Sequence, residues 1–439
     1  MRIAVVALGK IGLPLAVQYA KAGHQVTGVD INERCVELVN SGTVPFPGEA
    51  HLDEYLTEVT DNGLFSATTD YAEAIPTADV VVLVVPLLVD EVTGEPDFGW
   101  MDVAVSELAR TITADTLVLF ETTLPIGTTR TRWKPMIESI SGLSEADGVH
   151  LAFSPERVLT GRVFSDLRKY PKLIGALSDQ GAALTRDFYD AVLEFDERPD
   201  LERPNGVWDL GNAEAAEMAK LAETTYRDVN IALANQFALH AQNIGVDVFA
   251  VIEASNSQPF SHIHRPGVAV GGHCIPVYPK LYLSGDADAS VVRTAREANE
   301  AMPTHTVELL ANALEGGVAG KRVAVLGAAY RGGVKETAVS GVFELARVLS
   351  ANGATPVVHD PMYTDEELTR LGLTVYELGT PIDAAIVHTD HVEYRSLKAS
   401  DLPGAQVLVD GRRITSSEGW GTTKRLVLGD GAANAQVAD

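Results

Sequence analysis

The chain has 439 residues, which is more than one hydrophobic core usually supports and predicts two or three domains. Hydrophobic residues make up 46% of the chain and charged residues 21%, as in an ordinary soluble globular protein. The formal charge of −26 argues against nucleic acid or an anionic membrane as a partner, because both would be repelled. No apolar run resembles a secretion signal or spans a bilayer, so we expect a cytoplasmic protein.

The first half of the chain alternates short β-branched runs with helical patterns, which is typical of βαβ units in a parallel sheet. The runs are almost continuously apolar, which suits strands buried on both faces. The predicted strands are Arg2–Ala7, Gln25–Asp30, Asp79–Val85, Thr116–Glu121, Val149–Phe153 and Lys172–Gly175. We therefore assign residues 1–200 to a Rossmann domain of the α/β class.

A long helical pattern without proline runs from Asn212 to about Asn256. Its apolar positions recur every three or four residues and form one stripe, made of Tyr226, Val229, Leu233, Phe237 and His240. A helix of this length connects two domains and often forms a dimer contact. We assign residues 201–315 to a central helical region and expect a homodimer or a higher homo-oligomer.

The strand and helix alternation resumes in the last part of the chain. The predicted strands there are Arg322–Gly327, Pro356–Asp360, Asp383–Thr389 and Gln406–Asp410. We assign residues 316–428 to a second Rossmann-like domain, so the predicted fold is two parallel-sheet domains joined by a long central helix. Residues 429–439 contain too little apolar surface to pack and are predicted to be disordered.

A dinucleotide-binding pattern follows the first predicted strand. The segment Ala7-Leu8-Gly9-Lys10-Ile11-Gly12 precedes a helix, and Asp30 ends the next strand, 18 positions after Gly12. The glycines let the backbone approach a pyrophosphate and the acid holds ribose hydroxyls, which favours NAD over NADP. Ala7 stands where the usual pattern has its first glycine, and the alternative is a plain strand, turn and helix. The expected NAD contacts are Gly9, Ile11, Gly12, Asp30, Val85, Pro86 and Thr123.

A second motif surrounds one of the two cysteines of the chain. Gly271-Gly272-His273-Cys274-Ile275-Pro276 places Cys274 on a glycine-lined loop, which in a nucleotide-binding protein suggests covalent chemistry on an oxidised substrate. Cys35 lies in another predicted domain, so we expect no disulfide. We expect no metal site.

Together with other segments, this loop resembles the nucleotide-sugar 6-dehydrogenases of the UDP-glucose/GDP-mannose dehydrogenase family. The matching segments occur in family order and span residues 1 to about 415. They are Gly9–Pro14, Glu121–Thr129, Phe153–Val158, Ala216–Lys220, Gly271–Pro276, Gly327–Arg331 and Asp410–Arg412. The resemblance implies an NAD domain, a central helix at a dimer interface and a C-terminal domain for the sugar nucleotide. It also implies a four-electron oxidation of a hexose CH2OH to a carboxylate with two molecules of NAD.

The resemblance also implies catalytic roles for four residues. Cys274 would attack the C6 aldehyde and later carry a thioester, while Lys220 would stabilise the oxyanion at C6. Glu156 would help activate the water that cleaves the thioester, and Thr123 would hold that water or the nicotinamide side. The alternatives are that Cys274 is inert, that Lys220 is only solvated, and that Glu156 and Thr123 are a cap and a turn residue.

The implied substrate is a nucleoside-diphosphate hexose, with UDP-glucose or TDP-glucose as the first expectation and UDP-N-acetylmannosamine as an alternative. Basic groups would grip its diphosphate, since a protein of this charge must concentrate them locally. The expected substrate contacts are Glu156, Lys220, Thr224, Arg265, Gly271, Tyr330, Arg331 and Arg412.

Three positions depart from the family pattern. Tyr278 stands where the family usually has Asp, Thr224 where it has Asn, and Ala338 where it has Arg. The first two changes leave the base for the C6 hydroxyl open between Lys220 and a water on Glu156. A two-electron dehydrogenase is a rival enzyme class, and a nucleotide-sugar-binding homologue without turnover is a non-catalytic one.

Overall fold

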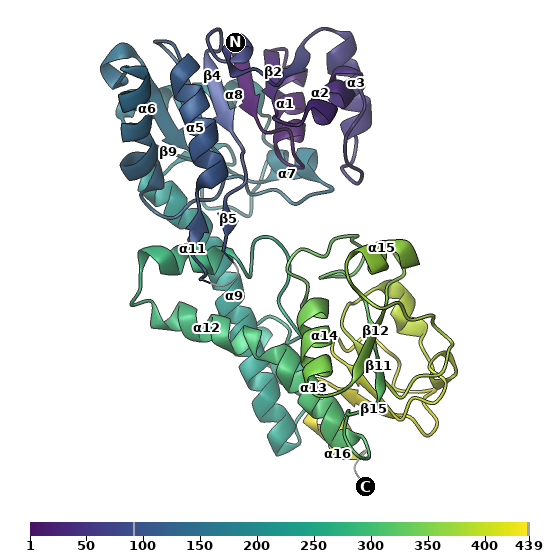
Figure 1. The fold of residues 1–439 in the computed structure, drawn as a ribbon. Helices are drawn as coiled ribbons and strands as arrows, with labels where there is room; N and C mark the ends of the chain where they lie inside the picture. Colours follow the sequence, from purple (N-terminus) through teal and green to yellow (C-terminus); the bar gives the residue numbers. More distant parts are fainter. Residues whose placement is uncertain (91–92, 437–439) are drawn as a thin grey trace. The chain divides into compact units, whose positions relative to one another are not determined.

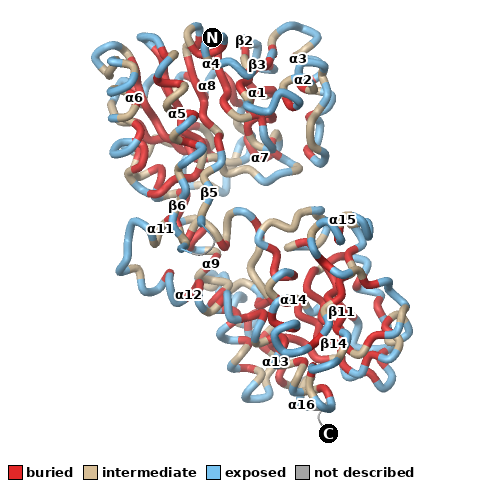
Figure 2. The backbone as a smooth tube through the Cα atoms, in the orientation of Figure 1, coloured by how far each residue is buried: buried red, intermediate tan, exposed pale blue. Residues whose placement is uncertain are grey.

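The computed structural model describes residues 1–90 and 93–436. Backbone contacts divide the chain into two units, Met1–Ala222 and Glu223–Asp439. In each unit the buried residues concentrate along the central strands and the helix faces that cover them (Figure 2). Within the described residues, no helix is both long and apolar enough to cross a membrane.

The first unit is built on one eight-stranded sheet with the order β10-β9-β8-β7-β4-β1-β2-β3. Six strands run parallel: β1 (Arg2–Val6), β2 (Gln25–Val29), β3 (Phe65–Thr68), β4 (Val80–Leu83), β7 (Leu117–Phe120) and β8 (His150–Phe153). The next strand, β9 (Lys172–Ala176), is antiparallel to β8, and β10 (Val207–Asp209) is parallel to β9. The sequence predicts every strand here except β3 and β10. The strand order reverses between β1 and β4, where open α/β sheets bind their ligands.

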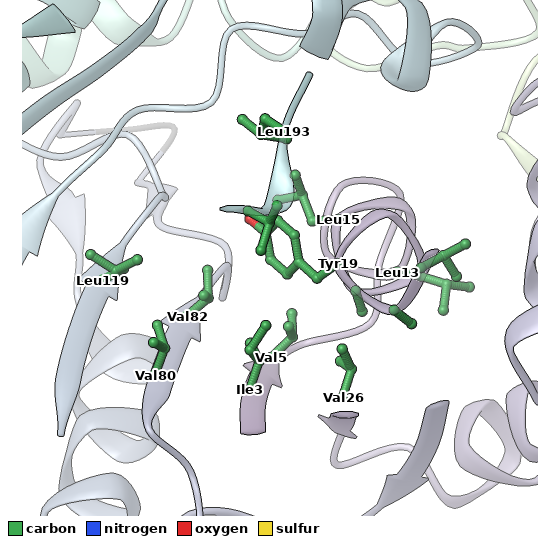
Figure 3. Packing of buried hydrophobic residues seen from close by; sticks show 14 of the residues in the cluster. Ile3, Val5, Leu13, Leu15, Tyr19, Val26, Val80, Val82, Leu119 and Leu193 are labelled. Carbon is green, nitrogen blue, oxygen red and sulfur yellow. The ribbon is translucent and has the colours of Figure 1, made fainter. Parts of the chain in front are cut away.

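Helices cover both faces of this sheet (Figure 1). They are α1 (Gly12–Lys21), α2 (Glu33–Asn40), α3 (Leu52–Asp61), α4 (Tyr71–Ala74), α5 (Gly99–Thr111), α6 (Lys134–Ser141), α7 (Val163–Lys169) and α8 (Asp179–Val192). Alternate residues of β1 point to opposite faces. Ile3 and Val5 therefore join a core with α1, α3, α7 and α8, while Ala4 and Val6 join one with α5 and α6. Figure 3 shows Tyr19 of α1 among aliphatic side chains of the first core.

The long central helix predicted from Asn212 to Asn256 is two helices in the structure. Helix α9 (Ala213–Ile244) ends at Gly245, which has a left-handed φ of 73°, and α10 (Val248–Asn256) follows. The Asp247 carboxylate accepts a hydrogen bond from the Phe249 backbone N–H and starts the new helix. The prediction of one helix to Asn256 is wrong because this glycine and this N-cap outweigh the apolar periodicity.

The second unit contains a five-stranded parallel sheet with the order β12-β11-β13-β14-β15. Its strands are β11 (Arg322–Leu326), β12 (Thr355–His359), β13 (Ala384–Val387), β14 (Val407–Asp410) and β15 (Lys424–Val427), of which only β15 is not predicted. Its other helices are α11 (Tyr278–Gly285), α12 (Ser290–Glu300), α13 (Met302–Ala313), α14 (Gly341–Ala351) and α15 (Asp365–Arg370). The α/β class with two Rossmann-like sheets and a long helix between them is confirmed.

The predicted disordered tail is partly ordered. A final helix, α16 (Gly431–Gln436), follows β15, and the backbone N–H of Gly431 donates to the Val246 carbonyl at 2.9 Å. The Asn434 amide bonds both the N–H and the carbonyl of Val427, at 2.9 and 3.0 Å. The prediction is wrong for this segment because hydrogen bonds, rather than apolar surface, hold it. Residues 437–439 lie outside the described residues.

Candidate active site

The predicted site residues of the first unit gather at one edge of its sheet. Gly9 to Gly12 follow β1, Asp30 follows β2, and Val85 and Pro86 follow β4. Thr123 follows β7 and Glu156 follows β8. Because these strands run parallel, their carboxyl ends lie at the same edge, where a doubly wound sheet holds its ligand.

The turn after β1 depends on two unusual backbone positions. A Cβ atom on Gly12 would lie 1.9 Å from the Ala7 carbonyl oxygen, so no larger residue fits there. Ala7 has a left-handed φ of 75°, the conformation that glycine adopts at no steric cost. Keeping alanine there costs about 1 kcal/mol. Ala7 therefore preserves the shape of the turn although the usual glycine is missing.

The same turn has the features that a dinucleotide needs. No atom lies within 4 Å of a Cβ built on Gly9, so that side of the turn is open for a phosphate. The Asp30 carboxylate accepts hydrogen bonds from the backbone N–H of Leu8 at 2.8 Å and of Asn32 at 2.9 Å. A carboxylate has about four acceptor positions, so Asp30 keeps capacity for ribose hydroxyls. The residues present fit NAD.

Glu156 belongs to a buried charged cluster that the sequence did not predict. The Lys172 ammonium donates to Glu156 Oε2 at 2.8 Å and to Glu121 Oε2 at 2.7 Å. Burial alone would raise the pKa of Glu156, but Lys172 and the backbone N–H of Arg157 outweigh it and hold that pKa below its ordinary value. Burial raises the pKa of Glu121. Glu156 is therefore the more acidic carboxylate of the pair.

Lys220 lies beside Glu156 although the two are 64 residues apart. Its Nζ donates to the Glu156 backbone carbonyl at 2.6 Å. One turn earlier on α9, the buried Glu217 accepts from the backbone N–H and the hydroxyl of Thr129, at 3.0 and 2.7 Å. This contact ties α9 to the segment that contains the buried Thr123. Thr224 follows Lys220 by four residues and so lies on the same helical face.

Cys274 and six of the predicted substrate residues belong to the second unit. The loop before the half-buried Cys274 packs against Tyr330, since a Cβ on Gly271 would lie 2.6 Å from Tyr330 Cβ. The backbone N–H of Gly272 donates to the Ala338 carbonyl at 2.9 Å. The Cys274 carbonyl accepts from the backbone N–H of Tyr278 at 2.9 Å, at the start of α11. The structure thus brings Tyr330, which follows β11, against Gly271 of the cysteine loop.

The three predicted arginines have different surroundings. Arg412 lies against the start of the cysteine loop, because a Cβ on Gly267 would be 2.8 Å from its Nη1. It also forms an ion pair with Asp390 at 3.4 Å. Arg331 is exposed and donates to the Tyr330 hydroxyl at 3.3 Å. Arg265 is exposed on the loop itself.

A second buried polar network supports this loop, and the sequence does not predict it either. The Asn235 amide oxygen accepts from the backbone N–H of Gly267 at 3.0 Å, and its amide nitrogen donates to Asn299 at 2.9 Å. Asn299 and Arg296 donate to Asp228 at 2.8 and 2.6 Å. Burial, partly offset by Arg296, raises the pKa of Asp228 to about 6. Polar residues inside a helical pattern gave no signal for this role.

The second sheet repeats the turn-and-acid design of the first. The backbone N–H groups of Ala328 and Ala329, after β11, donate to Asp360 Oδ2 at 2.7 and 3.0 Å. His391 Nε2 lies 3.1 Å from the same oxygen, and the backbone N–H of Met362 donates to the other at 2.9 Å. Asp360 follows β12, as Asp30 follows β2.

Comparison with known families gives three matches in chain order. Residues 1–193 match the NAD binding domain of the UDP-glucose/GDP-mannose dehydrogenase family. Residues 214–301 match its central domain, and residues 324–417 match its UDP binding domain. The first match confirms the predicted cofactor, NAD.

Individual relatives cover nearly the whole chain. The chain is 36% identical to a UDP-N-acetyl-D-mannosamine dehydrogenase of Pyrococcus horikoshii over 94% of its length and 96% of the relative. A solved UDP-D-ManNAc dehydrogenase structure from the same organism superposes with a TM-score of 0.86 at 33% identity, covering 98% of this chain and 100% of the other. A UDP-glucose dehydrogenase from Pyrobaculum islandicum gives a TM-score of 0.82 at 27% identity, covering 97% and 96%.

Substitutions at two glycines of the nucleotide turn should affect stability and cofactor binding separately. We expect Gly12→Ala to destabilise the protein by at least about 2 kcal/mol, because the new methyl group overlaps the Ala7 carbonyl. Gly9→Ala should leave the melting temperature unchanged and weaken NADH binding at least about tenfold, since its methyl group occupies the phosphate side. Thermal unfolding and NADH fluorescence titration measure the two effects. Equal NADH affinity in Gly9→Ala and the wild type would contradict this account of the turn.

Proposed function

Because the chain belongs to the UDP-glucose/GDP-mannose dehydrogenase family of NAD-dependent enzymes, we propose that it oxidises C6 of a nucleotide sugar to the carboxylate in two steps. The substrate we propose is UDP-N-acetyl-D-mannosamine. The relatives named for this substrate support it over UDP-glucose or TDP-glucose, because the solved UDP-D-ManNAc dehydrogenase is 33% identical to this chain, against 27% for the UDP-glucose dehydrogenase. The observation that carries the proposal is the contact of Lys220 with Glu156 at the ligand-binding edge of the NAD sheet.

The catalytic sequence uses one nucleophile and one fixed cation. The turn at Gly9–Gly12 and the Asp30 carboxylate would hold NAD, which would supply the hydride acceptor for each of the two oxidations. After the first oxidation, Cys274 Sγ adds to the C6 aldehyde, and after the second it holds the acid as a thioester. Lys220 stabilises negative charge on the C6 oxygen, since the Glu156 carbonyl holds its ammonium at the ligand-binding edge of the sheet.

Glu156 completes the reaction by activating water. A carboxylate accepts a proton only when it is ionised, and the lowered pKa of Glu156 keeps it ionised at neutral pH. The Thr123 hydroxyl positions the same water. For the base that deprotonates the C6 hydroxyl, Lys220 and a water held by Glu156 are the two candidates, because Tyr278 is a poor base near neutral pH.

We assign residues 1–200 to NAD binding, 201–315 to dimerisation and catalysis, and 316–428 to binding of the sugar nucleotide. A second copy of this chain is the partner proposed for α9. Its large apolar residues Tyr226, Leu233, Phe237 and Ile244 are exposed. Relative to Tyr226 they follow after 7, 11 and 18 positions, which is close to two, three and five turns, so they share one face. An exposed apolar face of this length is typical of a helix that packs against another subunit.

A substrate panel tests the proposed reaction. With UDP-N-acetyl-D-mannosamine and excess NAD, we expect two NADH per sugar and the uronate as product, measured by absorbance and mass spectrometry. UDP-glucose, TDP-glucose and GDP-mannose are expected to react at least about tenfold more slowly in kcat/KM. One NADH per sugar would support a two-electron enzyme instead. If NAD and the sugar nucleotide both bind tightly but no NADH forms, the result would support the nucleotide-sugar-binding homologue without turnover.

Cys274→Ser tests the thioester. We expect uronate formation to fall by a factor on the order of 10³ or more, because the serine hydroxyl is a much weaker nucleophile at neutral pH. Cys35→Ser is the matched control, since Cys35 lies buried beside the nucleotide turn, with its Sγ 3.9 Å from the Leu8 carbonyl oxygen. The control should keep wild-type uronate formation. Normal uronate release by Cys274→Ser would exclude the thioester.

Leu233→Glu tests the proposed dimer. Burying an unpaired carboxylate at the contact should weaken dimerisation by a factor on the order of 100. Gln236→Glu introduces the same charge at an exposed position of the same helix outside the apolar face and should leave the dimer intact. Light scattering after size exclusion measures the mass of each variant. A Leu233→Glu protein that stays dimeric would place the interface elsewhere.

A further inference from the structure

Lys172 reaches the ligand edge of the sheet because β9 runs against β8. The antiparallel register pairs Phe153 with Gly175 and Ala152 with Ala176. Continued by three residues along each strand, the same register places Glu156 opposite Lys172. The first residue of a parallel strand would lie at the far edge of the sheet. The strand reversal therefore brings a lysine to the edge where the carboxyl ends of β7 and β8 place Glu121 and Glu156.

The lysine is enclosed by acidic and phenolic groups. Its side chain is 5% exposed, and those of Glu121 and Glu156 are 0% and 10% exposed. The hydroxyls of Tyr19 and Tyr189 donate to Glu121 Oε1 at 3.1 and 2.7 Å. These donors hold Glu121 Oε1, so that Oε2 remains for Lys172. The ammonium thus lies between two carboxylates at nearly equal distances.

The titratable groups around Glu156 come from several elements. They are Glu121 after β7, Lys172 on β9, Tyr19 on α1, Lys220 on α9 and the neighbouring Arg157. Asp166 of α7 and Tyr170 just after it line the same pocket as Glu156 and Lys172. Lys220 meets the backbone carbonyl of Glu156, whereas Lys172 meets its carboxylate. Both carboxylates of the cluster can be ionised together only while Lys172 is charged between them.

We infer that Lys172 is a positioning residue for thioester hydrolysis, which holds the Glu156 carboxylate ionised and turned toward the edge of the sheet. The inference rests on the proposed function of Glu156. In this step the oxygen of water bonds to the acyl carbon C6, and the C–S bond breaks. Its electron pair leaves with Cys274 Sγ, and one proton of the water passes to Glu156. No oxidant or reductant takes part, because both oxidations precede the hydrolysis.

Lys172→Met removes the charge and keeps most of the side-chain volume. The two remaining buried carboxylates would then share a proton, and the pKa of Glu156 would rise because its cation is gone. Hydrolysis should fail below this raised pKa and recover as the pH increases through it. With UDP-N-acetyl-D-mannosamine and NAD, we expect the variant to form a burst of two NADH per Cys274 near pH 6 and then turn over slowly. Mass spectrometry of acid-quenched protein should show acylated Cys274, which disappears toward pH 9.

The double variant Glu121→Gln with Lys172→Met separates positioning from folding. It keeps the net charge of the wild-type cluster, because one negative and one positive charge are removed together, and circular dichroism checks its fold. If Lys172 served only to neutralise Glu121, the double variant would hydrolyse the thioester with the wild-type pH dependence. That result would overturn the inference. Acylated Cys274 at low pH in both Lys172 variants supports it.

Glu156→Gln distinguishes failure of the inference from failure of the proposed function. It should accumulate acylated Cys274 at every pH, since no carboxylate remains to accept the proton. If it accumulates none, Glu156 does not activate the water, and the role of Lys172 falls with it. If Glu156→Gln accumulates the acyl-enzyme and the two Lys172 variants do not, only the inference on Lys172 is wrong. Lys172→Arg, which keeps the charge, should restore most of the wild-type pH profile.

Discussion

The ammonium of Lys172 between Glu121 and Glu156 is the interaction on which the first unit depends most. A buried charge is costly unless it is paired and hydrogen-bonded, and here one cation satisfies two carboxylates at 2.7 and 2.8 Å. Two tyrosines from α1 and α8 complete the shell of Glu121. Five elements of the Rossmann unit, α1, α8, β7, β8 and β9, thus meet at one charged centre. The hydrophobic cores set the layers of the fold, and this centre fixes the ends of β7, β8 and β9 against each other.

Much of the fold could be predicted from local sequence. The apolar runs located β1, β4 and β11, and glycines followed by helices located the turn after β1. The direction of β9 could not be predicted, because Lys172–Gly175 has the same apolar pattern in a parallel or an antiparallel strand. Lys172 at the start of that run resembles a solvated residue until the reversal places it opposite Glu156. The sequence therefore contained Glu156 as a candidate but not its partner.

The central helix shows the limits of periodicity in another way. The pattern located an apolar stripe on α9 but not the side on which it would lie. In the structure Leu233 and Phe237 are exposed, while Asp228 and Asn235 are buried on the inner side. Polar residues can be buried there because Arg296 and Asn299 of α12 donate to Asp228, and Asn299 accepts from Asn235. Such hydrogen bonds join segments that are distant in the sequence, and the hydropathy of neither segment indicates them.

The two aspartates that follow the second strand of each sheet differ in how many acceptor positions remain. A carboxylate offers about four. Asp360 receives the backbone N–H groups of Ala328, Ala329 and Met362 together with His391, so its capacity is used within its own unit. Asp30 receives two backbone N–H groups and keeps room for two more donors. The two sheets therefore recognise nucleotides in different ways. Asp30 can accept hydrogen bonds from the hydroxyls of a ribose, whereas Asp360 has no acceptor position left. Any nucleotide on the second sheet must be recognised through other groups.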